Sequence, residues 1–164
     1  RTVEQLAMLI RAMAEMNLSN TTLLNEEFRV AELYLQIEQG RFGDRLKIRK
    51  SIDALCLELQ VPCFTLLPIV ENCIRHGIEV FDKDVEVILN ATCREDKAII
   101  EVSDTGRGIE TNDIDSLISP TSGIGQVRKN LETVFGSNAH LTIEALAPSG
   151  TRVSIVFPIL DNNV

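Results

Sequence analysis

A short row of polar residues interrupts an otherwise apolar stretch between residues 66 and 77, whose apolar positions recur at helical spacing. The interrupting residues are Glu71, Asn72, Arg75 and His76. Because residues four apart share a helix face, a carboxylate and an amide oxygen project beside two potential cations. Such oxygens suit Mg²⁺, which proteins hold through one or two ligands completed by water and substrate phosphates. The stretch predicts a metal–nucleotide site, and the alternative is a half-buried helix whose polar edge meets water.

A second group of candidate residues begins where an apolar run ends at Asp104. A carboxylate at the end of a buried strand can accept a hydrogen bond from an exocyclic amine, whereas its ordinary structural role is an Asx turn. Gly106 and Gly108 permit a sharp turn and close backbone approach. Gly123 and Gly125 open a predicted helix and can direct backbone amides at phosphates. These residues supply candidate contacts for a base and for phosphates.

Composition and charge limit the classes of partner. The chain has 164 residues, enough for one domain with a smaller appended element. Sixteen Lys and Arg against 24 Asp and Glu give a net charge of -8, which argues against broad binding to nucleic acid or to an anionic membrane. No apolar run approaches the ~18 to 20 residues of a membrane span. The chain begins at Arg1 rather than methionine, so we expect an excised piece that lacks upstream segments.

Four cysteines, at positions 56, 63, 73 and 93, form no Cys-x-x-Cys pair that would indicate zinc or a redox dithiol. Three of them fall at apolar-periodic positions, where cysteine behaves as a small hydrophobic residue. We therefore expect buried, reduced thiols and a reducing cytoplasm.

Apolar periodicity predicts two helices ahead of the polar stretch. The first covers residues 2–16, and the second runs from Leu24 to about residue 39, with Thr22 as a possible N-cap and residues 40–44 as its end. The short polar turn between them predicts an antiparallel pair. That pair could dock on the core or on a second copy of the chain.

The rest of the chain predicts a sheet and two further helices. The predicted strands cover residues 46–52, 85–93, 98–103, 141–145 and 151–157. One helix over 62–76 would be opened by Pro62, kinked or reset by Pro68 and capped by Gly77. The other, over 125–135, would turn Val127, Leu131, Val134 and Phe135 inward. Residues 53–61 are ambiguous, and residues 109–122 predict a mobile loop. We expect an α/β (α+β) sandwich whose mixed, mostly antiparallel sheet carries both helices on one face.

Three segments of the chain, taken in order, resemble the N, G1 and G2 boxes of the GHKL ATPase superfamily, whose members share the Bergerat nucleotide-binding fold. The N box is residues 68–77, Pro-Ile-Val-Glu-Asn-Cys-Ile-Arg-His-Gly; the G1 box is 104–108, Asp-Thr-Gly-Arg-Gly; the G2 box is 123–125, Gly-Ile-Gly. The N box is similar to the Pro-Leu-Val-Glu-Asn-Ala-Ile-Lys-His-Gly of LytS-like sensor histidine kinases. Residues 34–42, Tyr-Leu-Gln-Ile-Glu-Gln-Gly-Arg-Phe, match that branch's Tyr-Leu-x-Ile-Glu-x-x-Arg-Phe segment. The resemblance covers nearly the whole chain.

This resemblance implies a site for ATP and Mg²⁺. On the phosphate side, it implies that Asn72 coordinates the metal, that Glu71 is the catalytic residue near the phosphoryl centre, and that Arg75 or His76 faces phosphate. Gly123 and Gly125 would approach the phosphates. On the base side, it implies that Asp104 reads the adenine amino group beside Gly106 and Gly108, with Thr151 lining the adenine pocket.

The chain departs from the LytS-like pattern at two places. The G2 box of that branch reads Gly-x-Gly-Leu-x-Asn-Val-Arg, and ungapped alignment on Val127-Arg128 puts Thr121 at the first glycine and Gly125 at a variable position. The other register pairs Gly123 and Gly125 with the two glycines and requires a two-residue deletion. The phosphoacceptor motif His-Phe-x-Phe-Asn is missing, because His76 belongs to the N box and His140 precedes a predicted strand.

The resemblance thus implies the ATP-binding catalytic domain of a two-component sensor histidine kinase, residues 44–164, preceded by a helical segment, residues 1–43, that follows an absent acceptor helix. Its expected partners are ATP, the upstream histidine, a response regulator and a second copy in a homodimer, with no nucleic acid. Its expected place is the cytoplasmic side of a membrane-anchored sensor. The alternatives are a nucleotide-gated clamp and a non-catalytic nucleotide-binding or dimerisation module.

Overall fold

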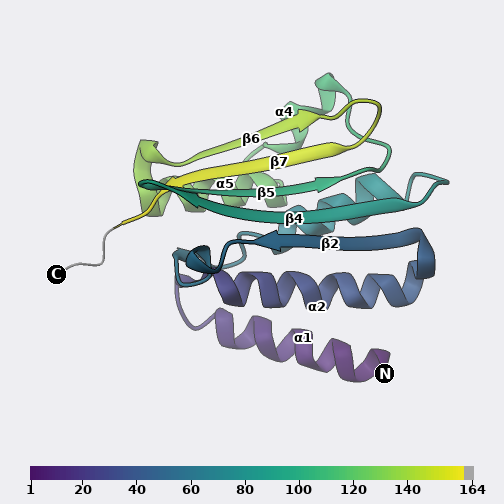
Figure 1. Ribbon diagram of the computed structural model, residues 1–164, viewed down its shortest axis with the longest axis horizontal. Coiled ribbons are helices and arrows are strands. Elements are labelled where there is room, and N and C mark those ends of the chain that lie inside the picture. Colours follow the sequence, from purple (N-terminus) through teal and green to yellow (C-terminus); the bar gives the residue numbers. More distant parts are fainter. Residues whose placement is uncertain (161–164) are drawn as a thin grey trace.

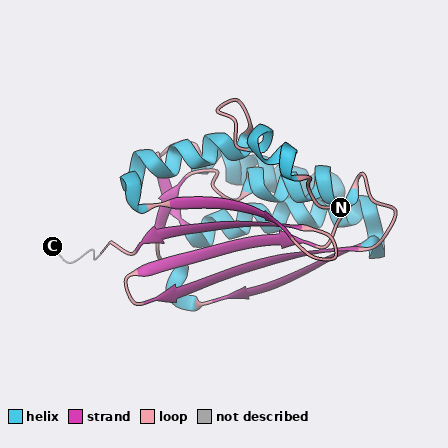
Figure 2. Ribbon diagram, turned by 90° about the horizontal axis from the view of Figure 1, so that it is seen from above, coloured by secondary structure: helices cyan, strands magenta, loops and turns pink. Residues whose placement is uncertain are grey.

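A five-stranded sheet with helices on one of its faces forms the architecture of the computed structural model, which describes residues 1–160 (Figures 1 and 2). The strands are β2 (Leu46–Ile52), β4 (Val85–Arg94), β5 (Lys97–Asp104), β6 (His140–Ala145) and β7 (Thr151–Pro158). Their order is β2-β4-β5-β7-β6; β2 runs parallel to β4 and the other neighbours are antiparallel. The predicted sandwich with a mixed, mostly antiparallel sheet is confirmed. Positions 161–164 of the predicted domain lie outside the described residues.

Alternation along the central strands explains why only one face carries helices. In β4, Val85, Val87, Leu89 and Ala91 are buried, while the residues between them are partly exposed. β7 alternates in the same way, and its Phe157 ring lies 5.0 Å from the ring of Phe135 on the covering helix α5. Both central strands thus turn one apolar row toward the helices, as the period of two requires.

The two N-terminal helices are α1 (Thr2–Met16) and α2 (Leu24–Phe42). α2 docks on the core of this chain, with Leu24 and Leu35 fully buried, and α1 packs against α2 through Leu9, Ala12 and Met16. A second apolar stripe of α1 stays exposed and consists of Val3, Leu6 and Ile10. The core, rather than a second copy, therefore holds this pair in place.

The start and end of α2 differ from the prediction. Thr22 is not its N-cap, because it lies in the short strand β1 (Thr21–Leu23), which pairs with β3 (Gln60–Pro62). The amides of Leu24 and Asn25 donate instead to backbone carbonyls of the segment before β3, at 2.8 and 3.0 Å. The helix continues through Gly40 and ends at Gly43, whose φ of 60° suits glycine.

The helix predicted over residues 62–76 was misplaced at both ends. Pro62 closes β3, and the helix α3 (Leu67–Asn72) starts five residues later, with Pro68 in its first turn, where the missing N–H costs no hydrogen bond. The chain then continues into a π-helical segment, η3 (Cys73–Ile78). Gly77 lies inside that segment and is not a C-terminal cap.

The segment after β5 contains more regular structure than the predicted loop. A 3-10 turn, η4 (Thr111–Asp113), leads into one helical turn, α4 (Ile114–Leu117). The next helix, α5 (Gly123–Phe135), starts two residues earlier than predicted. Val134 is 38% exposed, so its predicted inward orientation is wrong, whereas Val127, Leu131 and Phe135 are buried. Further 3-10 turns are η1 (Gly43–Arg45), η2 (Ala54–Cys56) and η5 (Gly136–Asn138).

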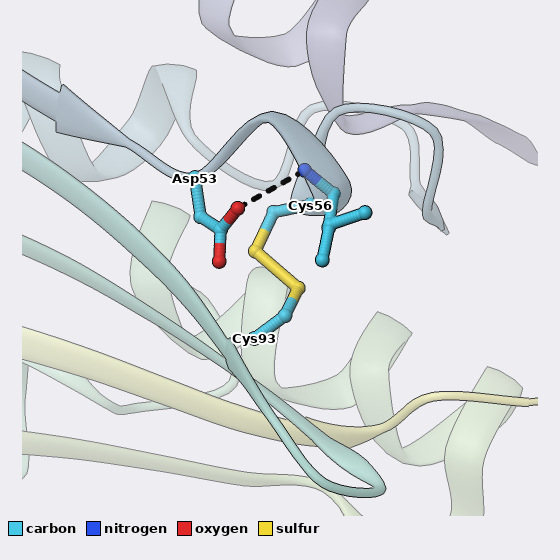
Figure 3. The surroundings of a disulfide bond; sticks show 4 residues. Asp53, Cys56 and Cys93 are labelled. Carbon is cyan, nitrogen blue, oxygen red and sulfur yellow. Dashed lines mark hydrogen bonds between the residues drawn. A yellow bond between two sulfur atoms is a disulfide. The ribbon is translucent and has the colours of Figure 1, made fainter.

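The expectation that all four thiols are reduced is wrong for two of them. Cys56 and Cys93 form a disulfide with Cα atoms 5.9 Å apart, a separation that a disulfide normally spans (Figure 3). Asp53 accepts a hydrogen bond from the Leu55 amide, and this turn presents Cys56 to β4. The pairing depends on a long-range approach across 37 residues, which local spacing does not reveal. Cys63 and Cys73 are buried free thiols.

Within residues 1–160, no helix is both long enough and apolar enough to span a bilayer.

One buried carboxylate lies away from the predicted site. Glu27 of α2 is 1% exposed and accepts hydrogen bonds from the amides of Phe64 and Leu66, just before α3. Burial raises the pKa of Glu27 from 4.5 to about 7, because the backbone hydrogen bonds offset only part of the desolvation. The folded chain therefore binds this proton more tightly than the unfolded chain does.

This shift predicts an unusual dependence of stability on pH. An acid with a raised folded pKa contributes stability below its unfolded pKa that is lost as the pH rises through the folded value. Between about pH 4.5 and pH 8, the free energy of unfolding of the wild type should fall by roughly 3 kcal/mol relative to Glu27→Gln. Burial also raises the pKa of Asp104, to about 6. Asp104 therefore changes the free energy of unfolding with pH in the same direction and equally in both proteins, so its effect cancels when the two are compared. Urea denaturation at both pH values measures the difference in free energy of unfolding between the wild type and Glu27→Gln. A difference that is the same at both pH values would contradict the raised pKa of Glu27.

Candidate nucleotide-binding site

The N-box helix places its four polar residues at a half-exposed edge. Glu71 and Asn72 end α3 and are partly buried, whereas Arg75 and His76 in η3 are exposed. Burial raises the pKa of Glu71, and the nearby charge of Arg75 offsets part of that shift. The Glu71 carboxylate is thus only partly hydrated, and the charge of Arg75 lies close to it.

Asp104, the last residue of β5, lies beneath this helix and is 2% exposed. Its Oδ1 accepts a hydrogen bond of 2.9 Å from the Gly106 amide. Burial raises its pKa to about 6, and hydrogen bonds from the Gly106 amide and the Cys73 thiol counteract the rise. The same burial, together with the charge of Asp104, raises the pKa of the Cys73 thiol. The Asx turn, which was the alternative role for Asp104, is present, and the carboxylate is also buried against the N box.

Two glycines allow the N box and the G1 box to meet. A Cβ on Gly106 would collide with the backbone of Gly77 and lie 2.9 Å from Asp104 Oδ1. A Cβ on Gly77 would lie 3.1 Å from the same oxygen. Position 106 therefore requires glycine, because its Cβ would overlap the Gly77 backbone, whereas a Cβ at position 77 would be a tight contact that the Asp104 side chain would have to yield to. The π-helical segment is therefore pressed directly onto the end of β5.

Behind Asp104, the neighbouring strand supplies the floor of the site. Thr151 is buried and pairs with Asp104 in the β5–β7 register. Gly108 adopts a φ of 83°, and a Cβ there would lie 2.9 Å from the Gly150 carbonyl oxygen. The turn after the G1 box thus folds back over the start of β7, which brings Asp104, Gly106, Gly108 and Thr151 together.

A cavity of about 270 Å³ opens beside this contact. Its lining is His76, Val80, Arg107, Gly108, Ile109, Glu110, Asp113, Ser116 and Leu117. His76 and Gly108 are the predicted site residues in this lining. Arg107 of the G1 box also lines it. The segment predicted as a mobile loop forms one wall through η4 and α4, so it is placed where a lid over a ligand would lie.

The two glycines of the G2 box have different surroundings. Gly123 is exposed at the first turn of α5, and a Cβ there would lie 3.2 Å from Pro68 of α3. Gly125 is buried, and a Cβ there would collide with the Ser119 carbonyl. The amide of Gly125 donates to Ser122 Oγ at 2.9 Å, so it is already engaged by the N-cap of the helix.

The structure gathers the predicted residues along one helix. Asp104 and the glycines around it contact η3, and Gly123 adjoins α3 at Pro68, one turn before Asn72. Gly125 lies one layer away, beneath the residues that follow α4. Within residues 1–160, no cluster of three or more His, Cys, Asp or Glu side chains could hold a metal by itself. A cation here would depend on oxygens such as Asn72 together with the phosphates of a ligand.

Sequence reasoning missed the contacts that hold the N-box helix against α2. Arg41 pairs with Glu79, directly after η3, at 2.8 Å. Tyr34 lies near Glu71, and burial, followed by the surrounding carboxylates, raises its pKa. Both residues belong to the 34–42 segment that carried the resemblance. Glu27 carried no sequence signal other than an acidic residue on an apolar helix face.

Comparisons with known proteins identify relatives of this chain. Residues 64–161 match the family of histidine kinase-, DNA gyrase B-, and HSP90-like ATPases. The sensor protein LytS of Staphylococcus saprophyticus is 32% identical over 162 residues, which are 94% of this chain and 27% of that protein. LytS of Staphylococcus epidermidis is 30% identical over 166 residues, which are 96% of this chain and 28% of that protein. The chain thus spans about a quarter of the length of these relatives.

Solved structures show the same fold. The histidine kinase domain of the Erythrobacter litoralis EL346 blue-light activated histidine kinase superimposes with a TM-score of 0.65 at 22% identity. The match covers 97% of this chain and 75% of that one.

The packing of Gly125 predicts a local effect of substitution. Gly125→Ala would push the backbone at Ser119 away from α5 and should cost about 1 to 3 kcal/mol through overpacking. It should also speed proteolysis within residues 109–122. Gly40→Ala is the matched control, because a Cβ at Gly40 meets nothing within 4 Å, and it should stabilise α2 by about 0.5 to 1 kcal/mol. Equal rates of proteolysis of the two variants would show that the position of the Ser119 backbone does not depend on glycine at 125.

Proposed function

Because this chain belongs to the family of histidine kinase-, DNA gyrase B-, and HSP90-like ATPases, we propose that it is the Mg-ATP-binding catalytic domain of a two-component sensor histidine kinase. It would transfer the γ-phosphoryl group of ATP to a histidine on a helix outside this chain. The observation that carries the proposal is the buried carboxylate of Asp104 directly beneath the helix that bears Glu71 and Asn72.

The residues fit a bound nucleotide on two grounds. Asp104 is a buried acceptor held in place by the Gly106 amide, so it can receive the exocyclic amine of adenine in a site that excludes water. Gly77 and Gly106 leave no side chain between this carboxylate and the helix above it. Thr151 and Gly108 would line the base side, and His76 faces the cavity next to them.

On the phosphate side, Asn72 would provide an oxygen to Mg²⁺, which neutralises phosphate charge when it is bound. Arg75 and His76 are exposed at the same edge and would face the phosphates. The exposed start of α5 at Gly123 would approach them from the other side. Glu71, whose pKa is raised by burial, would accept the proton of the attacking histidine.

The helical segment suggests the partners. The exposed stripe of α1, formed by Val3, Leu6 and Ile10, is an apolar surface that a second copy would cover in a homodimer. An upstream histidine helix would supply the acceptor, and a response regulator would receive the phosphoryl group. The relatives are named sensors, which supports a place on the cytoplasmic side of a membrane-anchored receptor.

Substitution of Asp104 and Asn72 tests the two halves of the site. Asp104→Asn should weaken Mg-ATP binding by about 1 to 3 kcal/mol, because the new amide can present a donor to the adenine amine. Asn72→Ala should remove the dependence of binding on Mg²⁺ while sparing much of the base contact. Titration calorimetry with and without Mg²⁺ measures both effects. Asp96→Asn, an exposed aspartate at the other end of the same hairpin, is the control.

If Asp104→Asn binds as tightly as the wild type, Asp104 serves only its turn. If the wild-type chain does not bind Mg-ATP at all, it is a non-catalytic module.

Phosphoryl transfer gives the second test. Neither His76 in the N box nor the exposed His140 at the start of β6 has an acceptor motif around it, so this chain should bind Mg-ATP without labelling itself. A longer chain that includes the upstream histidine should form acid-labile phosphate, and Asn72→Ala in that chain should abolish it. Labelling of the present chain that disappears on His140→Ala would place the acceptor at His140. ATP hydrolysis with no phosphoprotein in the longer chain would point to a nucleotide-gated clamp.

A further inference from the structure

Glu27 is the buried acid that the proposed mechanism leaves without a role. It lies on α2 among buried apolar residues, including Leu24 and Phe28, and is 1% exposed. Burial of a carboxylate is costly unless hydrogen bonds replace its lost hydration. A glutamate kept at such a position must therefore be held by something specific.

The residues before α3 form a receptor for this carboxylate. The Phe64 amide donates to one carboxylate oxygen at 2.6 Å and the Leu66 amide donates to the other at 2.8 Å, while the Thr65 amide adds a third backbone interaction. Phe64 has a φ of 61°, which is uncommon for a residue with a side chain. Successive amides that pass from left-handed to right-handed backbone form a concave nest for anions. Thr65 Oγ1 donates to the Pro62 carbonyl at 2.6 Å and fixes the loop.

The nest leads directly into the helix that carries the metal side of the site. Leu66 is the N-cap of α3, and Glu71 lies five residues further on, about 7.5 Å along the axis at the helical rise. A displacement at Leu66 is therefore passed to Glu71 and Asn72 by a continuous helix. The base side depends on other elements, since Asp104 and Thr151 are held by β5 and β7.

We propose that Glu27 is a positioning residue that ties helix α2 to the start of the N-box helix and so sets the placement of Glu71 and Asn72 toward Mg-nucleotide. The inference rests on the proposed function and extends it from the site to the helical segment before it. α2 packs on α1, so a shift of these helices relative to the sheet would pull the carboxylate out of the nest. The titratable group facing Glu27 is the buried Cys63 thiol, whose pKa is raised by burial and by the Glu27 charge.

Glu27→Gln tests the role without removing volume. Phe64 and Leu66 each donate to a different oxygen, so an amide in place of the carboxylate turns an NH₂ group toward one of these two donors. At about pH 8, where the wild-type carboxylate is ionised, the variant should bind Mg-ATP at least about fivefold more weakly, within the usual range of coupling between sites. Binding of ATP in EDTA should change by less than about twofold, because the base side does not depend on the nest.

Glu26→Gln is the matched control. It makes the same chemical change one residue earlier on α2, where the side chain is 39% exposed and pairs with Arg29. Hydrogen exchange should accelerate at the amides of Phe64 and Leu66 in Glu27→Gln and stay at the wild-type rate in Glu26→Gln. This readout needs no nucleotide and reports on the nest itself.

The outcomes separate this inference from the proposed function. A wild-type chain that does not bind Mg-ATP would overturn the proposed function and the positioning role with it. A wild-type chain that binds, together with a Glu27→Gln variant that binds equally well or loses ATP affinity equally with and without Mg²⁺, would overturn only the role of Glu27. If hydrogen exchange at the amides of Phe64 and Leu66 is unchanged in Glu27→Gln, Glu27 does not act through the nest.

Discussion

The close approach of η3 to the end of β5 is the contact on which the site depends. It requires glycine at position 106, where a Cβ would collide with the Gly77 backbone, and it leaves little room at position 77, where a Cβ would lie 3.1 Å from Asp104 Oδ1. Once the two elements touch, a carboxylate at a strand end and the oxygens at a helix edge lie on one side of the sheet. The other parts of the molecule hold this contact: β7 supports Asp104 from below, and α2 and α5 hold the helix from its sides.

Three buried or partly buried carboxylates of this chain carry an electrostatic cost. Burial raises the pKa values of Glu27, Asp104 and Glu71, in a chain that already carries a net charge of -8. Each of the three carboxylates would have a lower free energy in water, so burial does not stabilise the fold. Placement of a ligand or of a helix explains their burial better. Two of them receive backbone amides rather than ion pairs. Amides fix the direction of a carboxylate without adding a second charge.

Local patterns predicted the elements well and their long-range partners poorly. The strands from 85 to 103 follow from alternation, because every second side chain there faces the core. The α1 helix follows from the helical period, although its apolar residues Val3, Leu6 and Ile10 stay exposed. Pro62 was misassigned since a proline suits the first turn of a helix and the edge of a short strand equally. The Cys56–Cys93 disulfide and the Glu27 contacts join segments 37 residues or more apart, so neither leaves a local signal. For the site, the motif residues could be named in advance, whereas the nest of residues 64–66 could not.

The two glycines of the G2 box have surroundings that favour one of the two registers that its sequence allowed. Gly123 is exposed at the first turn of α5 and adjoins Pro68, which puts it where a backbone can approach a ligand held by the N-box helix. Gly125 is buried under Ser119, and its amide is occupied by Ser122, so it has neither the access nor the free donor for that task. The ungapped register, which pairs only Gly123 with a glycine of the LytS-like pattern and leaves Gly125 at a variable position, therefore agrees with the geometry. Gly125 is glycine because of packing: it lets the residues after α4 lie against α5, and this contact holds the wall of the cavity in place.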